Sequence, residues 1–164
     1  MTTNPATGTT ERSRSSSALK AIVWAGLIAG AMDITAAFVT WKLLANVAPA
    51  RILKGIASGL LGPAAYQGGA GIAALGLFLH FVIAFGAATV FYIASKKMRF
   101  LTAKPVVSGP LYGVAVYVFM YWIVLPLSAV HRAPFSARLA LLAIATHIVC
   151  VGTPIALAVR RFSR

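Results

Sequence analysis

Four polar side chains lie inside long apolar segments of this sequence: Asp33, His80, Tyr117 and His147. Each lies nine residues from one end of its segment, and those ends are marked by Lys42, Gly71, Pro126 and Arg138. Nine residues of helix span about 13–14 Å, because the rise is ~1.5 Å per residue. That distance is close to half of the ~30 Å hydrocarbon thickness of a bilayer. The spacing therefore predicts a polar layer, formed by these four residues, near the midplane of a membrane.

The polar layer has the groups needed to hold a proton or a small solute. A carboxylate at the middle of a bilayer costs several kcal/mol unless it is protonated or paired. Asp33 can hold a proton itself, or it can pair with a protonated His80 or His147. Either arrangement titrates in the physiological pH range. We therefore expect an integral membrane protein with a proton- or small-solute-binding layer, in which Asp33 is the proton or cation site and the histidines are its partners.

Two other interpretations of these residues stay open. His80 and His147 lie at one depth on different predicted helices, which meets the minimum for axial ligation of a b-type haem. The haem propionates would then need basic partners, and the candidates are Arg51, Lys54 and Arg132. Alternatively, the layer is a hydrogen-bond network that fixes helix packing in a structural or accessory subunit of a membrane complex. We expect no cofactor outside the haem alternative, and no metal, because two histidines and one carboxylate make a poor dehydrated metal site.

No catalytic signature of a soluble enzyme is visible in the sequence. Ser128 has no matched histidine and acid, and the glycines do not form the strand–loop–helix pattern of a phosphate-binding loop. We therefore expect that the chain is not an enzyme.

The composition is that of a membrane protein. Of the 164 residues, 60% are hydrophobic and only 10% are charged, against about a quarter in soluble domains. The 15 Lys and Arg outnumber two acids, Glu11 and Asp33. These basic residues flank the apolar segments, where they attract anionic lipid headgroups; we expect no nucleic-acid partner. The single cysteine, Cys150, excludes an intrachain disulfide.

The apolar segments predict an all-α, integral membrane four-helix bundle. Residues 1–17 are rich in Ser and Thr, and we expect a disordered cytoplasmic tail there. Residues 18–164 form one membrane domain, since four stretches reach the ~20 residues that cross a bilayer. The predicted spans are 21–44, 71–95, 106–128 and 138–159.

The distribution of basic residues predicts the orientation. With four spans, the N-terminal tail, the second loop and the C-terminal tail share one side of the membrane and carry ten Lys and Arg, whereas the opposite side carries five. The positive-inside rule then places both termini in the cytoplasm.

A short amphipathic helix is predicted between the first two spans, at 49–61. Ile52, Leu53, Ile56 and Leu60 recur there at helical spacing. Pro49 suits the first turn of a helix, and the Gly62-Pro63 pair ends it. We expect this helix to lie on the outer membrane surface or to cap the bundle.

Each residue of the polar layer lies on a helical stripe of small residues. Gly30 and Ala37 accompany Asp33, Ala84 accompanies His80, and Gly113 precedes Tyr117 by one turn. Small residues allow helices to approach closely, so these stripes predict the bundle interior. The bulky residues on other faces are expected to meet lipid: Phe78, Phe81, Phe85, Leu141 and Leu142.

Three short runs resemble the YagU-like family of bacterial inner-membrane proteins. They are His80 through Phe85, Leu125-Pro126-Leu127 and His147-Ile148-Val149, and the likeness covers residues 71 to 160. The biochemical role of that family is not established. The resemblance implies a location in the bacterial inner membrane and lends weight to His80 and His147 as positions to mutate. Apart from the resemblance, the partners that we expect besides membrane lipids are a second copy of the chain or a membrane partner subunit.

Overall fold

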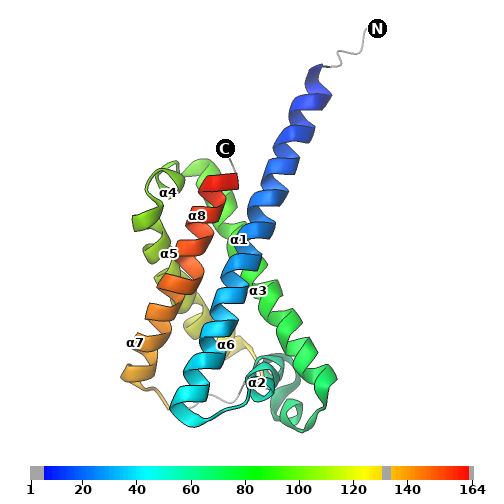
Figure 1. The fold of residues 1–164 in the computed structure, drawn as a ribbon, viewed down its shortest axis with the longest axis vertical. Coiled ribbons are helices and arrows are strands. Elements are labelled where there is room, and N and C mark those ends of the chain that lie inside the picture. Colours follow the sequence, from blue (N-terminus) through cyan, green and yellow to red (C-terminus); the bar gives the residue numbers. More distant parts are fainter. Residues whose placement is uncertain (1–5, 131–133, 163–164) are drawn as a thin grey trace.

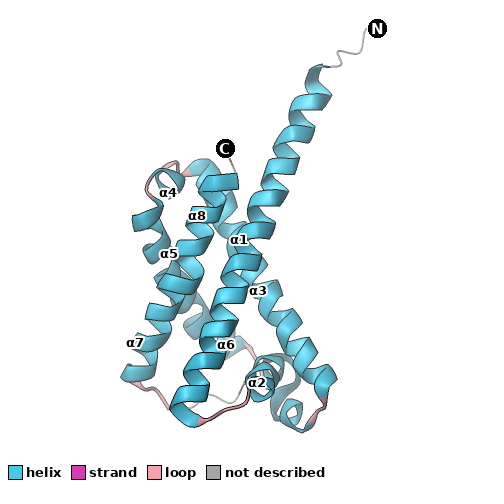
Figure 2. Ribbon diagram, in the orientation of Figure 1, coloured by secondary structure: helices cyan, strands magenta, loops and turns pink. Residues whose placement is uncertain are grey.

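The computed structural model describes residues 6–130 and 134–162, which are almost entirely helical and contain no strand (Figure 2). The helical elements of the first half are α1 (Ala6–Ala45), α2 (Pro49–Leu61), the short η1 (Gly62–Gln67) and α3 (Ala70–Lys97). The second half contains α4 (Phe100–Ala103), α5 (Pro105–Phe119), η2 (Met120–Val124), α6 (Leu125–Leu127), α7 (Ala137–Thr146), η3 (His147–Gly152) and α8 (Thr153–Phe162). The predicted all-α fold with a short helix between the first two spans is confirmed.

Within the part of the chain that the structure describes, four helical stretches are long and apolar enough to cross a membrane, as expected of a multi-pass membrane protein. They are Ser17–Ala45, Ala70–Lys97, Pro105–Leu127 and Ala137–Phe162. The third runs through α5, η2 and α6, and the fourth through α7, η3 and α8. The start of α1 and the end of α8 lie at one end of the bundle, here named the terminal end, while α2 lies at the opposite end, here named the α2 end (Figure 1).

Helix α1 begins at Ala6, inside the segment for which a disordered tail was predicted, and it projects beyond the bundle at the terminal end (Figure 1). Adding residues to an existing helix costs little, because the unfavourable step is its nucleation. The apolar span provides that nucleus. The other end of α1 is Ala45. The next residue, Asn46, has a left-handed φ of 52°, a conformation that is common directly after helices.

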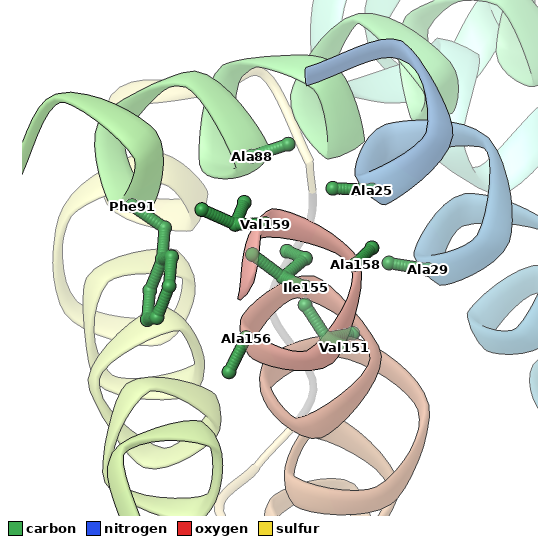
Figure 3. Packing of buried hydrophobic residues seen from close by; sticks show 9 residues of the cluster. All are labelled: Ala25, Ala29, Ala88, Phe91, Val151, Ile155, Ala156, Ala158 and Val159. Atoms are coloured by element: carbon green, nitrogen blue, oxygen red, sulfur yellow. The ribbon is translucent and has the colours of Figure 1, made fainter. Parts of the chain in front are cut away.

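The terminal end of the bundle is tightly packed around α8. This helix contacts α1, α3, α4 and α5. Figure 3 shows nine buried apolar residues that meet there, and Phe91, Ile155 and Val159 are its largest fully buried apolar side chains. Tyr112 of α5 closes the gap to α3, since its hydroxyl donates to the carbonyl oxygen of Ala87 at 2.6 Å. This half of the bundle is therefore a dry core.

At the α2 end, α2 caps the bundle by packing against α3. Gly76 of α3 permits this contact, because a Cβ added there would lie 2.7 Å from the carbonyl carbon of Leu53. The backbone amide of Ala129 donates to the carbonyl oxygen of Gly59 at 2.9 Å and ties the chain after α6 to α2. Pro49 begins α2, and Gly62, at a φ of 65°, follows its last residue. The predicted capping helix is present.

Two of the spanning helices contain a π-helical turn, η2 and η3. Each ends two residues before a proline, Pro126 and Pro154 respectively. A proline ring clashes with the carbonyl of the residue four positions earlier and lacks an amide proton. The wider π turn, with its i→i+5 bonds, accommodates this local defect.

The small-residue stripes face the interior, and every stripe residue named above is buried or half-buried. Phe78, Leu141 and Leu142 are exposed, as expected of the predicted lipid-facing residues. The prediction is wrong for Phe81 and Phe85, because their half-buried rings pack on α1.

The glycines of α1 explain why Phe81 and Phe85 pack inside the bundle. A Cβ added to Gly30 would lie 2.7 Å from the ring of Phe81, and one added to Gly26 would overlap the ring of Phe85. These two glycines receive aromatic rings rather than another helix backbone.

We predict that Gly113→Ala destabilises the protein, because the new Cβ would lie 2.5 Å from the carbonyl oxygen of His147 and 2.7 Å from the Cα of Ile148. Overpacking of this kind costs about 1–3 kcal/mol. Gly86→Ala is the matched control, since nothing lies within 4 Å of the added Cβ. Thermal unfolding in detergent should show a lower midpoint for Gly113→Ala alone. Equal midpoints for the two variants would contradict the close approach of α5 and η3.

Candidate functional site

A cavity of about 120 Å³ lies at the centre of the bundle. Its polar lining residues are Asp33 of α1, His80 of α3 and His147 of η3. The rest of the lining is apolar or glycine: Ala29, Gly30, Ile56, Ile83, Ala84, Ala87, Val116, Met120 and Val151. Three of the four predicted polar-layer residues thus face one central cavity, which has room for several water molecules at ~30 Å³ each.

A second hollow of about 210 Å³, here named the side groove, lies between α1 and α7. It shares Asp33 and His147 with the central cavity. From these two residues it runs along Thr40 and Trp41 of α1, toward the α2 end. Asp33 and His147 therefore stand where the groove meets the cavity.

His80 links α3 to α1 through a hydrogen bond between Nε2 and the carbonyl oxygen of Gly30, at 2.9 Å. A carbonyl oxygen only accepts, so Nε2 carries the proton in this bond. In the neutral ring Nδ1 is then an acceptor. The ring of Phe81 stands edge-on to His80 at 5.5 Å between centroids, which helps to fix the orientation of the imidazole.

His147 is held by its own helix and by α5. Its Nδ1 lies 2.8 Å from the carbonyl oxygen of Ala143, so Nδ1 donates and Nε2 is the acceptor in the neutral ring. Tyr117 packs edge-on against the imidazole at 5.7 Å between centroids. Because Gly113 lets α5 approach the start of η3, Tyr117, one turn further along α5, reaches His147. Tyr117 contacts His147 but is not among the residues that line the cavity or the groove.

Asp33 is the exception in this network. Among the residues that the structure describes, its carboxylate makes no hydrogen bond and no salt bridge. The predicted alternatives included a direct Asp33–His pair, and such a contact is not formed. The thiol of Cys150 lies near enough for an electrostatic interaction with Asp33. The carboxylate thus faces the two hollows without a protein partner for its charge.

The haem alternative fits this geometry poorly. Nε2 of His80 is engaged with the carbonyl oxygen of Gly30, and the cavity of about 120 Å³ is smaller than the ~300–1,000 Å³ of typical pockets for drug-sized ligands. Arg132, one of the predicted propionate partners, lies outside the described residues. Within the described ranges, no three His, Cys, Asp or Glu side chains stand close enough to hold a metal ion.

The sequence did not reveal the contribution of the two π turns to this site. Met120 begins η2, His147 begins η3, and both line the cavity. A π turn often marks a functional site, because it leaves backbone groups without their usual α-helical partners. The signal that was available is the pair of prolines inside predicted spans. Ile56 of α2, which also lines the cavity, could not be placed without knowing how α2 packs.

No protein family matches the chain, and neither a curated protein sequence nor a solved structure gave a match.

We predict that Asp33→Asn leaves the free energy of unfolding unchanged or raises it, because the carboxylate makes no bond that the amide would lose. His80→Phe is the comparison, since it removes a bond between two helices and should cost about 0.6 kcal/mol, up to ~1.7. Thermal and denaturant unfolding in detergent measure both. If Asp33→Asn destabilised the protein as much as His80→Phe, Asp33 would belong to a packing network, as the structural interpretation requires.

Proposed function

We propose that this chain is a bacterial inner-membrane protein, with both termini in the cytoplasm, whose polar layer binds a proton or a small solute. The single observation that carries the proposal is the carboxylate of Asp33, which has no protein partner among the described residues and faces both hollows. The excess of basic residues at the terminal end supports the orientation. The resemblance to the YagU-like family supports the choice of membrane.

Asp33 suits a binding function because an isolated charge is costly inside a bilayer. An ionised carboxylate at mid-depth is unfavourable by several kcal/mol, so intramembrane acids are kept where they serve proton or ion binding. Asp33 lies on an interior stripe, next to a cavity with room for water, and this arrangement lets it exchange protons. His80 and His147 each present one unprotonated ring nitrogen in their neutral forms, so both can receive a proton from the same cavity.

The distribution of packing supports binding with access from one end. The side groove leads from Asp33 toward the α2 end, whereas the buried apolar cluster around Ile155 and Val159 fills the terminal half. A carrier that moves its solute in steps needs one closed and one open side at a time. The groove and the dry core provide this asymmetry.

A structural or accessory role is the second candidate, and two bonds favour it. His80 to Gly30 and Tyr112 to Ala87 both join helices inside the bundle. These bonds account for His80 and Tyr112 as packing residues. They leave the unpaired Asp33 unexplained, and for this reason we prefer the binding function.

We predict that dicyclohexylcarbodiimide, an apolar reagent for protonated carboxyl groups, labels Asp33 in the purified protein. The sequence has one other acidic side chain, Glu11, so a Glu11→Gln background leaves Asp33 as the only side-chain carboxyl. Peptide mass mapping should locate the label at Asp33, and labelling should slow as the pH rises. The Asp33→Asn variant is the control and should stay unlabelled. A parent protein that resists the reagent at every pH would contradict a protonatable Asp33.

Proton flux in proteoliposomes is the functional test. We expect the parent protein to acidify or alkalise the lumen when a pH gradient is imposed, and we expect Asp33→Asn to abolish that flux. Flux that survives unchanged in Asp33→Asn, or no flux in the parent protein, counts against proton movement through this site. An optical spectrum of the same preparation tests the haem alternative, for which a Soret band is required.

A further inference from the structure

The polar groups that line the central cavity are acceptors of hydrogen bonds. The ring N–H of His80 is used by the carbonyl of Gly30, and that of His147 by the carbonyl of Ala143. What remains on each neutral ring is a nitrogen lone pair. An ionised Asp33 adds two oxygens that only accept. A ligand that satisfies these groups must therefore bring its own donors.

The fixed charge in the lining of the cavity is negative and belongs to Asp33. None of the described Lys or Arg side chains lines the cavity or the side groove, although the whole chain has 15 of them and only two acids. The ionisable groups that face Asp33 from the neighbouring elements are His80 and His147 in the cavity lining and the thiol of Cys150. An anionic ligand would find no fixed positive charge here, whereas a cation would neutralise Asp33.

The side groove offers surfaces that suit the approach of a cation. Thr146 donates its hydroxyl proton to the carbonyl of Leu142 at 2.9 Å, so its oxygen is left as an acceptor. Trp41 lines the groove beyond Thr40, and an indole face attracts cations by ~0.5–2 kcal/mol. The remaining lining is apolar and can contact methyl or methylene groups.

We propose that the ligand of this site is a small organic cation with an apolar body and at least one N–H donor, of the alkylammonium class. This inference rests on the proposed function, since it names the solute of the same site. The hollows of about 120 and 210 Å³ admit a ligand of a few heavy atoms. The ammonium donates an N–H to Asp33, any further N–H groups can donate to the free imidazole nitrogens, and the alkyl groups contact the apolar lining.

One carboxylate cannot hold a proton and an ammonium at the same time. When the cation binds to protonated Asp33, the carboxyl group releases its proton and the ionised carboxylate pairs with the ammonium. One positive charge enters and one leaves, so the charge of the site is conserved. Binding of the cation and protonation of Asp33 therefore compete, and this competition couples the solute to protons.

Protection of Asp33 from dicyclohexylcarbodiimide tests the inference in the Glu11→Gln protein, reconstituted in lipid nanodiscs at roughly neutral pH, where an alkylamine is protonated. Trimethylammonium is the probe, because a tertiary amine does not couple to the activated carboxyl group. It should slow the labelling of Asp33 about tenfold at ten times its Kd. Three molecules of similar shape are the controls: tetramethylammonium, which has no N–H; tert-butanol, which is neutral; and tert-butylsulfonate, which is an anion without a carboxyl group that could react with the carbodiimide.

Each outcome decides a different point. Protection by trimethylammonium that is much stronger than by all three controls supports the inference. Equal protection by tetramethylammonium overturns the need for an N–H donor, and protection by tert-butylsulfonate overturns the cationic class. Normal labelling without any protection overturns the inference but leaves the protonatable site intact. The absence of labelling without ligand overturns the proposed function itself.

Discussion

The fold depends on keeping one carboxylate away from hydrocarbon. Asp33 lies in the middle of a helix that otherwise crosses the bilayer as an apolar rod, and its charge cannot be tolerated against acyl chains. Gly30 beside it lets α3 come close, with the ring of Phe81 and the side chain of Ala84 in contact with the glycine. Asp33 is half-buried and stands where the central cavity meets the side groove, with α3 and η3 lining the cavity beside it.

Two kinds of packing give the bundle its asymmetry. In the terminal half, glycines bring backbones into contact: a Cβ added to Gly109 would lie 2.7 Å from the Cα of Thr153. The interior is less filled from the middle of the bundle toward α2, since the central cavity lies at mid-bundle and the side groove runs from it toward the α2 end. Ile56 of α2 closes the cavity from that side. The site therefore adjoins the packed apolar cluster on one side and the side groove on the other.

The features that repeat along the chain could be predicted from the sequence. Hydrophobic length defined the four spans, proline and glycine bounded α2, and the small-residue stripes identified the interior face of each helix. These signals are local, because they depend on residues within a few turns of one another.

The features that depend on pairs of helices could not be predicted in the same way. Phe81 and Phe85 look like lipid-facing residues until the glycines of α1 are placed opposite them. Tyr117 shares the predicted depth of the polar layer, yet it packs edge-on against His147 and does not line the cavity. The π turns before Pro126 and Pro154 shift the register of the downstream residues, and no periodic pattern reports such a shift. A direct Asp33–His pair was one of several arrangements at equal depth, and depth alone does not set a side-chain distance.

The central claim is that Asp33 faces a hydrated interior space rather than lipid or a fixed ion-pair partner. Asp33 is the only aspartate in the sequence, so protein labelled with ¹³C at the aspartate side-chain carboxyl gives a single resonance in solid-state NMR of lipid-embedded samples. We expect magnetisation transfer to that carbon from water protons, and a chemical shift that moves with pH as the carboxyl group ionises. Transfer from lipid acyl protons without any from water, together with a shift that stays constant across the pH range, would contradict the account.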